Sequence, residues 1–235
     1  MRVSRGRSSN VRRQRVDLRQ AVTFARSWRG VDPERVALWG TSLGGNHVVE
    51  VAASDPRIAA VVLNVPALDA IRGANLTEKR RRANVGYTQV LATTGQLLGA
   101  AAIDALRGAL GLSPRYIAVY GAPGRAFFTD PALAPRFAGV AAGSPTWQNR
   151  VAPRFLFQVP RLRPGTMERI TAPLLACIAS RDAEVSAAFV KAQVAKARRG
   201  EVREYPVDHF ETYHGATFEQ VAADQLEFLQ RHLRP

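Results

Sequence analysis

Short apolar runs alternate with helical segments along this sequence, and the alternation constrains the fold more than any other feature. Three of these runs, at 35–39, 58–65 and 173–179, are predicted as buried strands because they are too short for helices, and residues 201–206 are predicted as a strand because polar and apolar residues alternate along them. Amphipathic or alanine-rich segments predict helices over 16–29, 42–54, 183–198 and 217–233. Strands that are separated by helices need crossover connections, which favour a parallel sheet with helices on both faces. The sequence therefore predicts an α/β fold built on a mostly parallel sheet.

The alternation stops over residues 67–170, which we predict to be a helical insertion that forms a cap. This range contains a helical stretch at 89–110, a turn-rich segment at 120–125 and several aromatic side chains: Phe127, Phe128, Trp147, Phe155 and Phe157. The aromatics can line an apolar pocket for an acyl or alcohol group, or they can fill the core of the cap itself. At 235 residues the chain is predicted to be one domain, 1–235, that carries this insertion.

The chain has a formal net charge of +14, which is compatible with a nucleic-acid partner. Its basic residues are nearly all arginines that are scattered along the chain, apart from clusters at 79–82 and within 1–15. Basic charge alone reports non-specific affinity, so we expect no nucleic-acid partner. No apolar run is long enough to span a membrane, and the one cysteine, Cys177, lies within an apolar run. We expect a cytoplasmic protein with no membrane contact and an irregular segment over 1–15.

The segment at 40–44, Gly-Thr-Ser-Leu-Gly, follows the G-x-S-x-G pattern and lies between a predicted strand and a predicted helix. In that context the pattern predicts a strained turn that raises the Ser42 hydroxyl above the carboxyl end of the sheet. Strand and helix approach closely there, so small neighbours are needed, which Gly40, Gly44 and Gly45 supply. Leu43 begins the helix, so its N–H is a candidate donor to an oxyanion. The alternative interpretation is a glycine-rich turn that only packs a helix on a strand.

A serine nucleophile needs a base, and the chain has four histidines. His209 follows the strand predicted at 201–206 and is the preferred base, whereas His214 lies nearer to the next helix and is kept as the alternative. His47 is one helical turn past the serine and is expected to face solvent or its neighbours. His232 is expected in the last turn of the C-terminal helix, where the helix dipole favours a cation.

A carboxylate must fix the tautomer of the base, and Asp182 comes three residues after the strand predicted at 173–179. Its position again corresponds to the carboxyl edge of the sheet. Glu184 and Asp69 are alternatives, the first close to a helix start and the second shortly after the strand predicted at 58–65. Asp208 neighbours the preferred histidine and is expected to point elsewhere.

Three segments resemble bacterial α/β-hydrolases. RVALWGTSLGGNHVVEVAASDPRIAAVV resembles their elbow region, YPVDHFETYHGATFEQVAADQLEFLQRHL resembles their C-terminal end, and SPRYIAVYGAPG resembles the insertion of one actinobacterial-type subfamily. The resemblance implies a serine hydrolase of carboxylic esters, or of amides or thioesters, that forms an acyl-enzyme and needs no metal or other cofactor. It assigns Ser42, Asp182 and His209 to the triad, in the chain order of this fold. The acid lies in SRDAEVS, which departs from the family's D-x-D-x-V-x-P-like context.

The front of the sequence departs further from this family, since no HGxG-like loop precedes Ser42. We therefore expect that the chain lacks the N-terminal strands and the second oxyanion donor, with residues 5–15 as a remnant of the preceding loop. A strand left at the sheet edge could then pair with another chain and cause self-association. The expected partner is a small-molecule ester or amide substrate. The alternative is a catalytically impaired hydrolase remnant or an interaction domain.

Overall fold

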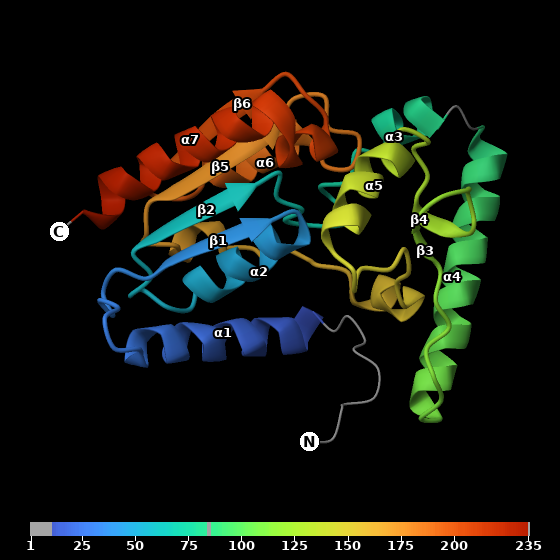
Figure 1. The fold of residues 1–235 in the computed structure, drawn as a ribbon, viewed down its shortest axis with the longest axis horizontal. Helices are drawn as coiled ribbons and strands as arrows, with labels where there is room; N and C mark the ends of the chain where they lie inside the picture. Colours follow the sequence, from blue (N-terminus) through green and yellow to red (C-terminus); the bar gives the residue numbers. More distant parts are fainter. Residues whose placement is uncertain (1–10, 84–85, 235) are drawn as a thin grey trace. The chain divides into compact units, whose positions relative to one another are not determined.

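The computed structural model describes residues 11–83 and 86–234, without the side chains of residues 83 and 139–141. The chain divides into two compact units. The sheet unit comprises Val11–Leu76 together with the residues from Pro160 onward, and the inserted unit comprises Thr77–Val159 (Figure 1). The inserted unit lies within the range 67–170 for which the sequence predicted an insertion, and its function as a cap stays a prediction.

The sheet unit is built on four strands that are all parallel, which confirms the predicted sheet. Their order is β1-β2-β5-β6, with bounds β1 Ala37–Thr41, β2 Ala60–Asn64, β5 Leu174–Ala179 and β6 Gly200–Tyr205. Thr41 pairs with Asn64, and Asn64 pairs with Cys177. The last residues of β1 and β2 therefore lie side by side at the carboxyl edge, where open α/β sheets bind ligands.

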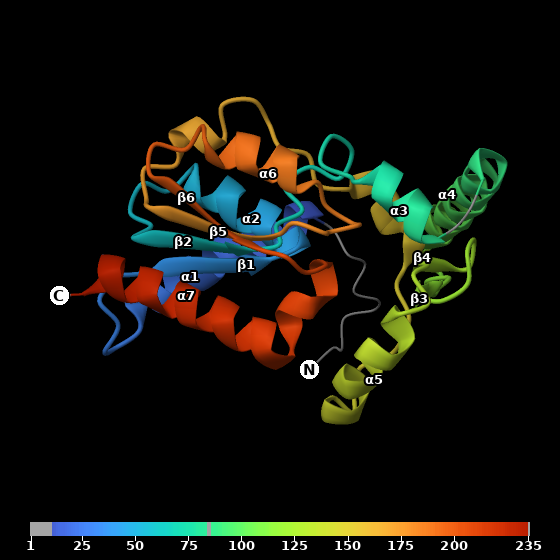
Figure 2. The same ribbon diagram turned by 90° about the horizontal axis from the view of Figure 1, so that it is seen from above.

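Helices cover both faces of this sheet, as predicted. α2 (Leu43–Ala52) and α6 (Ala187–Val194) lie on one face, α7 (Gly215–Leu233) lies on the other, and α1 (Val11–Ser27) packs on α2 (Figure 2). The face under α2 and α6 has a core of Val and Leu side chains from both layers, including Val49, Leu63 and Val190. The opposite face has a smaller core in which Val62 and Leu175 meet Phe228 of α7.

Helix α1 begins at Val11, so the expectation of an irregular segment over 1–15 is wrong for residues 11–15, whereas residues 1–10 lie outside the described residues. Arginine and glutamine are good helix formers, and this first part of the helix is held against α2. Val11 is buried there, and Arg15 donates to Asn46 Oδ1 at 2.7 Å. The basic residues at 11–15 thus belong to a packed helix.

Helix α6 is shorter than the predicted 183–198. The Asp182 carboxylate accepts the backbone N–H groups of Glu184 and Val185, which keeps these residues in a turn. Ser186 then caps the helix by accepting from the Phe189 N–H. The turn before α6 is therefore organised by Asp182.

The inserted unit has its own secondary structure and its own polar anchor. Its elements are α4 Tyr87–Ala109, β3 Ala118–Tyr120, β4 Ala126–Phe128, α5 Leu133–Gly143 and η1 Pro153–Gln158, and α3 Leu76–Ala83 lies at its boundary. The strands β3 and β4 form a short parallel pair that the sequence did not predict. Asp104 of α4 is fully buried and accepts two hydrogen bonds from the Arg154 guanidinium, at 2.6 and 2.8 Å. This ion pair ties α4 to η1.

Most of the aromatic residues noted in the sequence contact other aromatic rings of the inserted unit. Trp147 stacks with Tyr120 and Phe137, and Phe127 contacts both Phe128 and Phe155 edge to face. These contacts favour the interpretation that the aromatics fill the core of this unit, and Phe157 stays largely exposed.

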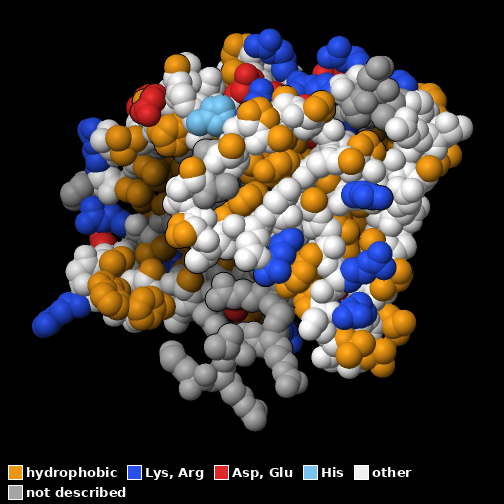
Figure 3. All heavy atoms as spheres, turned by 45° about the vertical axis from the view of Figure 1, so that its right-hand side comes forward, with side chains coloured by type: hydrophobic (Ala, Val, Ile, Leu, Met, Phe, Trp, Pro, Cys, Tyr) orange, Lys and Arg blue, Asp and Glu red, His pale blue; other side chains and the backbone are white. Residues whose placement is uncertain are grey.

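Basic side chains lie singly or in small groups among apolar and uncharged ones on the face drawn in Figure 3. Several arginines of the sheet unit pair with carboxylates, such as Arg26 with Asp55 and Arg57 with Glu34. The absence of a nucleic-acid partner stays a prediction. Within residues 11–83 and 86–234, no helix combines the length and the apolar character that crossing a membrane requires.

Candidate active site

Ser42 occupies a strained turn between β1 and α2. Its φ is +47° and its ψ is −118°, a conformation that non-glycine residues rarely adopt and that is typical of functional sites. The end of β2 and the segment after it hold this turn, because the Ser42 N–H donates to Asn64 O at 2.9 Å and the Ala67 N–H donates to Ser42 O at 2.8 Å. Both backbone groups of the strained residue are thereby satisfied.

Close packing around this turn depends on two glycines. A Cβ on Gly40 would lie 2.5 Å from Gly44 O, and a Cβ on Gly45 would lie 2.5 Å from Pro66 Cβ. Beyond its chain neighbours and the backbone of its own helix, a Cβ on Gly44 would meet no heavy atom of the described residues within 4 Å. The prediction that Gly44 must be small for close packing is therefore wrong, because the contact at this position is made by the backbone of Gly44 against Gly40.

This difference predicts opposite outcomes for two neighbouring substitutions. Gly40→Ala should lower the free energy of unfolding by about 1–3 kcal/mol, because its methyl group overlaps backbone atoms that cannot move independently. Gly44→Ala should leave stability unchanged or raise it slightly, since alanine favours a helix. Thermal unfolding of both variants followed by circular dichroism measures the effect, and equal destabilisation by the two substitutions would contradict this packing.

The structure brings Ser42, His209 and Asp182 together in one line of contacts. His209 Nδ1 lies 2.7 Å from Asp182 Oδ2, and His209 Nε2 lies 3.2 Å from Ser42 Oγ. His209 and Asp182 are buried, with 3% and 4% of their surface exposed. A carboxylate can only accept hydrogen bonds, so Asp182 favours the tautomer that carries its proton on Nδ1. This leaves Nε2 as an acceptor that faces the serine hydroxyl.

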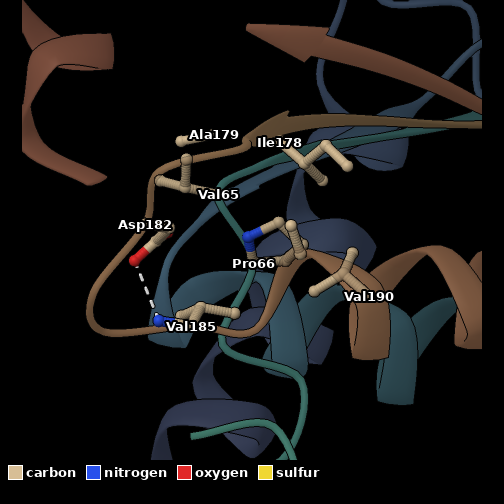
Figure 4. A pocket seen from close by; sticks show the side chains of 8 residues that line it. Val65, Pro66, Ile178, Ala179, Asp182, Val185 and Val190 are labelled. Atoms are coloured by element: carbon tan, nitrogen blue, oxygen red, sulfur yellow. Dashed lines mark hydrogen bonds between the residues drawn. The ribbon is translucent and has the colours of Figure 1, made fainter. Parts of the chain in front are cut away.

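Asp182 is held by the turn that follows β5. Its Oδ1 accepts the N–H groups of Glu184 and Val185 at 2.7 and 2.8 Å, while its main-chain carbonyl accepts from Asn75 Nδ2 at 2.7 Å. The carboxylate lies beside a small pocket that is otherwise lined by apolar side chains, and Figure 4 shows its bond to Val185. Two backbone donors fix one oxygen, so the other oxygen is left for His209.

His209 begins a short 3₁₀ helix, η3 (His209–Tyr213), which we call the His209 turn. Asp208 caps this turn by accepting the N–H groups of Phe210 and Glu211, and the Glu211 carboxylate accepts the Asp208 N–H. The sequence prediction that Asp208 points away from the histidine agrees with this capping geometry.

The alternative residues lie outside this line of contacts. Asp69 anchors the loop after β2 by accepting from the backbone of Arg72 and Leu162. Burial opposes ionisation of this carboxyl, but the N–H groups of Arg72 and Ile71 and the Arg72 guanidinium outweigh it and lower the pKa of Asp69 to about 2. His214 is exposed at the N-terminus of α7.

His47 points into the contact between α1 and α2, where only 8% of its surface is exposed. Its Nε2 lies 3.1 Å from Gln14 Oε1, and its Nδ1 has no partner among the described residues. Burial and the nearby Arg15 charge lower the pKa of His47 to about 4. His47 is thus a neutral packing residue at neutral pH, and none of its hydrogen bonds among the described residues goes to Ser42, Asp182 or His209.

The lowered pKa of His47 predicts acid sensitivity of the folded state. Between pH 6.5 and 4 the unfolded chain binds a proton at this histidine that the folded chain does not, so stability falls as the pH falls. Over this pH range the free energy of unfolding of His47→Gln should fall by about 1–2 kcal/mol less than that of the wild type. Thermal unfolding of both proteins from pH 7 to 4 tests this, and parallel curves for wild type and variant would contradict it.

Sequence reasoning missed the residues that hold Ser42 and Asp182 in place. Asn75 holds the Asp182 turn, and Asn64 and Ala67 hold the serine turn through their backbones. A signal existed for Asn64, since a polar residue in an otherwise apolar run such as 58–65 is unusual for a buried strand. No signal pointed to Ala67, which acts only through its N–H.

Comparison with known proteins relates the chain to esterases and other hydrolases. The family described as acetyl xylan esterase (AXE1) matches residues 8–84. The quorum-quenching protein AidA of Acinetobacter baumannii is 31% identical over 228 residues, which cover 94% of this chain and 70% of that protein. The thiohydrolase apmlB of Arthrinium phaeospermum is 41% identical over 58 residues, which cover 25% of this chain and 19% of that protein.

Among solved structures, the α/β hydrolase GrgF of Penicillium sp. sh18 is similar in fold. Its TM-score is 0.68 at 21% sequence identity, and the alignment covers 96% of this chain and 73% of GrgF. An alignment of this extent includes residues of both the sheet unit and the inserted unit.

Proposed function

This chain belongs to the α/β-hydrolase family and is a hydrolase, and from that premise we propose that it cleaves carboxylic esters through an acyl-enzyme on Ser42. The observation that carries the proposal is the contact chain from Ser42 Oγ through His209 to Asp182, at 3.2 and 2.7 Å. These distances lie within the reach that proton transfer between a nucleophile and its base requires.

In the first half of the proposed reaction, His209 Nε2 takes the proton of the Ser42 hydroxyl while Oγ attacks the carbonyl carbon of the ester. The carbonyl oxygen becomes an oxyanion as the new C–O bond forms. When this intermediate collapses, the bond to the leaving alcohol breaks and His209 gives its proton to the leaving oxygen. Asp182 stabilises the imidazolium that exists between the two transfers.

In the second half, His209 Nε2 takes a proton from a water molecule that attacks the acyl group on Ser42. The collapse of the second intermediate releases a carboxylic acid, and the Ser42 oxygen recovers its proton from His209. The same base thus acts twice, and the fixed tautomer keeps Nε2 available at both steps.

The Leu43 N–H is the proposed donor to the oxyanion. Leu43 is the first residue of α2, and the first N–H groups of a helix have no acceptor within the helix. The helix dipole adds positive potential at the same place. A donor of this kind typically contributes about 10²–10³ in rate.

The relatives indicate which acyl donors deserve testing. A family of acetyl xylan esterases matches the elbow region, and a thiohydrolase matches a shorter stretch. We therefore propose small-molecule esters as substrates and thioesters as a second class that the same acyl-enzyme can accept.

The proposal is tested by the way in which the acetyl-enzyme divides between reaction with hydroxylamine and reaction with water. p-Nitrophenyl acetate and acetylthiocholine are hydrolysed in the presence of hydroxylamine, and the ratio of acetohydroxamate to acetate is measured for each. An acetyl-enzyme common to both substrates predicts the same ratio, because the leaving group has departed before partitioning. A ratio that depends on the leaving group, or hydrolysis no faster than in buffer alone, would refute the proposal.

A further inference from the structure

Helix α7 covers one face of the sheet (Figure 2). At the end of this face, polar side chains form a layer that contacts the His209 turn. The side chains of this face alternate along the strands, and those below the layer are apolar, such as Ala60, Val62 and Leu175. At the last positions of β1 and β2 stand Thr41 and Asn64. The apolar pattern of the face is broken where the strands meet the active site.

These two residues connect the sheet to the His209 turn. Asn64 Nδ2 lies 3.4 Å from Thr41 Oγ1 and 3.4 Å from Thr212 Oγ1. Thr41 Oγ1 lies 2.7 Å from the Tyr213 hydroxyl, and the Thr212 hydroxyl donates to His209 O at 3.1 Å. Two successive residues of the turn are thus attached to the two residues that end β1 and β2.

This layer is an unfavourable place for polar atoms. Asn64 and Thr212 have only 3% and 1% of their surface exposed, and Asn64 Oδ1 has no hydrogen-bond partner among the described residues. A buried acceptor without a partner lowers stability, and an apolar side chain of similar size would avoid this cost. Arrangements that break a local rule of packing are expected at functional sites.

We propose that Thr41, Asn64, Thr212 and Tyr213 form a positioning network that sets the distance between His209 and Ser42. The inference rests on the proposed function. Capping by Asp208 shapes the His209 turn from within but does not locate it relative to the sheet. Thr41 directly precedes the nucleophile, and Thr212 bonds the carbonyl of the base, so the network links the two groups that must exchange a proton.

A loss of this link should slow the chemistry more than it affects folding. A displacement of about 1 Å between reacting groups can cost about 10²-fold in rate, so Asn64→Val and Thr212→Val should each react about 10- to 100-fold more slowly. Their KM values and melting temperatures should stay close to those of the wild type. Because the two residues act through one contact, the double variant should be no slower than the slower single variant.

The experiment measures the second-order rate of labelling by a fluorophosphonate, together with kcat and KM for p-nitrophenyl acetate. Thr212→Ser keeps the hydroxyl and should react at nearly the wild-type rate, whereas Thr212→Val keeps the shape and should not. This pair also decides the matter if Asn64→Val does not fold. Thr166→Val is the control, because Thr166 is a fully buried threonine whose hydroxyl bonds Arg169 instead.

The outcomes separate the inference from the proposed function. A wild-type protein that neither reacts with the probe nor hydrolyses the ester refutes both. If the wild type reacts and Asn64→Val and Thr212→Val react as fast as it does, the positioning network alone is refuted. The same holds if Thr212→Ser reacts as slowly as Thr212→Val. Slow labelling in the two valine variants, with normal labelling in Thr212→Ser and Thr166→Val, supports it.

Discussion

Replacement of Ser42 with alanine should lower kcat for p-nitrophenyl acetate by about 10⁴–10⁶-fold. The variant loses the atom that forms the acyl-enzyme, so only hydrolysis that is assisted by binding and by the Leu43 N–H remains. The measurement is steady-state hydrolysis at protein concentrations high enough to detect the residual rate.

The fold of this variant should be intact, because the Ser42 backbone makes the contacts that hold the strained turn. Its N–H and its carbonyl are bonded to Asn64 and Ala67, and alanine keeps both. An unchanged melting temperature is therefore the control. Activity within tenfold of the wild type in a folded Ser42→Ala protein would remove this residue from the mechanism.

Replacement of His209 with alanine should lower kcat at least about 10³-fold, whereas His214→Ala should have little effect. His209 is buried between Asp182 and Ser42, while His214 is exposed five positions later in the chain. The two variants form a matched pair, because each removes one imidazole from the same connection between β6 and α7.

Exogenous imidazole supplies an independent check on this pair. It should restore part of the activity of His209→Ala, since the cavity left by the side chain lies between the carboxylate and the nucleophile, and it should not change His214→Ala. Equal loss of activity in the two folded variants would contradict the assignment of the base.

The sequence could place Ser42, Asp182 and His209 at one edge of the sheet because parallel strands have their carboxyl ends there, and their catalytic roles stay a proposal. Each of these residues follows a predicted strand, so the fold class alone brings them to the same edge. This reasoning left Asp69 open as an alternative, because it also follows a predicted strand, and the structure gives Asp69 contacts with Arg72 and Leu162 instead.

The network under the His209 turn could not be predicted in this way. Asn64 and Thr212 are 148 residues apart in the chain, and their contact depends on how far the turn lies above β2. Local sequence patterns predict the strand and the turn separately but do not determine the distance between them. A polar residue at the end of an apolar run was the only local sign of it.

The start of α1 and the role of Gly44 differ from expectation for related reasons. The basic residues at 11–15 suggested an irregular segment, whereas contact with α2 buries Val11 and gives Arg15 a partner in Asn46. The G-x-S-x-G pattern names Gly44, but the crowded side-chain positions are those of Gly40 and Gly45. Tertiary contacts decide both cases.

Within the described residues β1 pairs only with β2, and self-association through this edge stays a prediction. Size-exclusion chromatography with light scattering tests it over a range of protein concentrations. Pairing of two β1 edges predicts a dimer whose proportion rises with concentration, whereas a monomer at all concentrations would contradict it.

The site of covalent attachment shows which residue of the protein is the nucleophile. The wild-type protein is treated with a fluorophosphonate, digested, and analysed by mass spectrometry, with Ser42→Ala treated in parallel. We expect one adduct per chain on the peptide that contains Ser42, and none on the variant. An adduct on any other residue of the wild type, or unmodified Ser42 in a protein that hydrolyses esters, would contradict it.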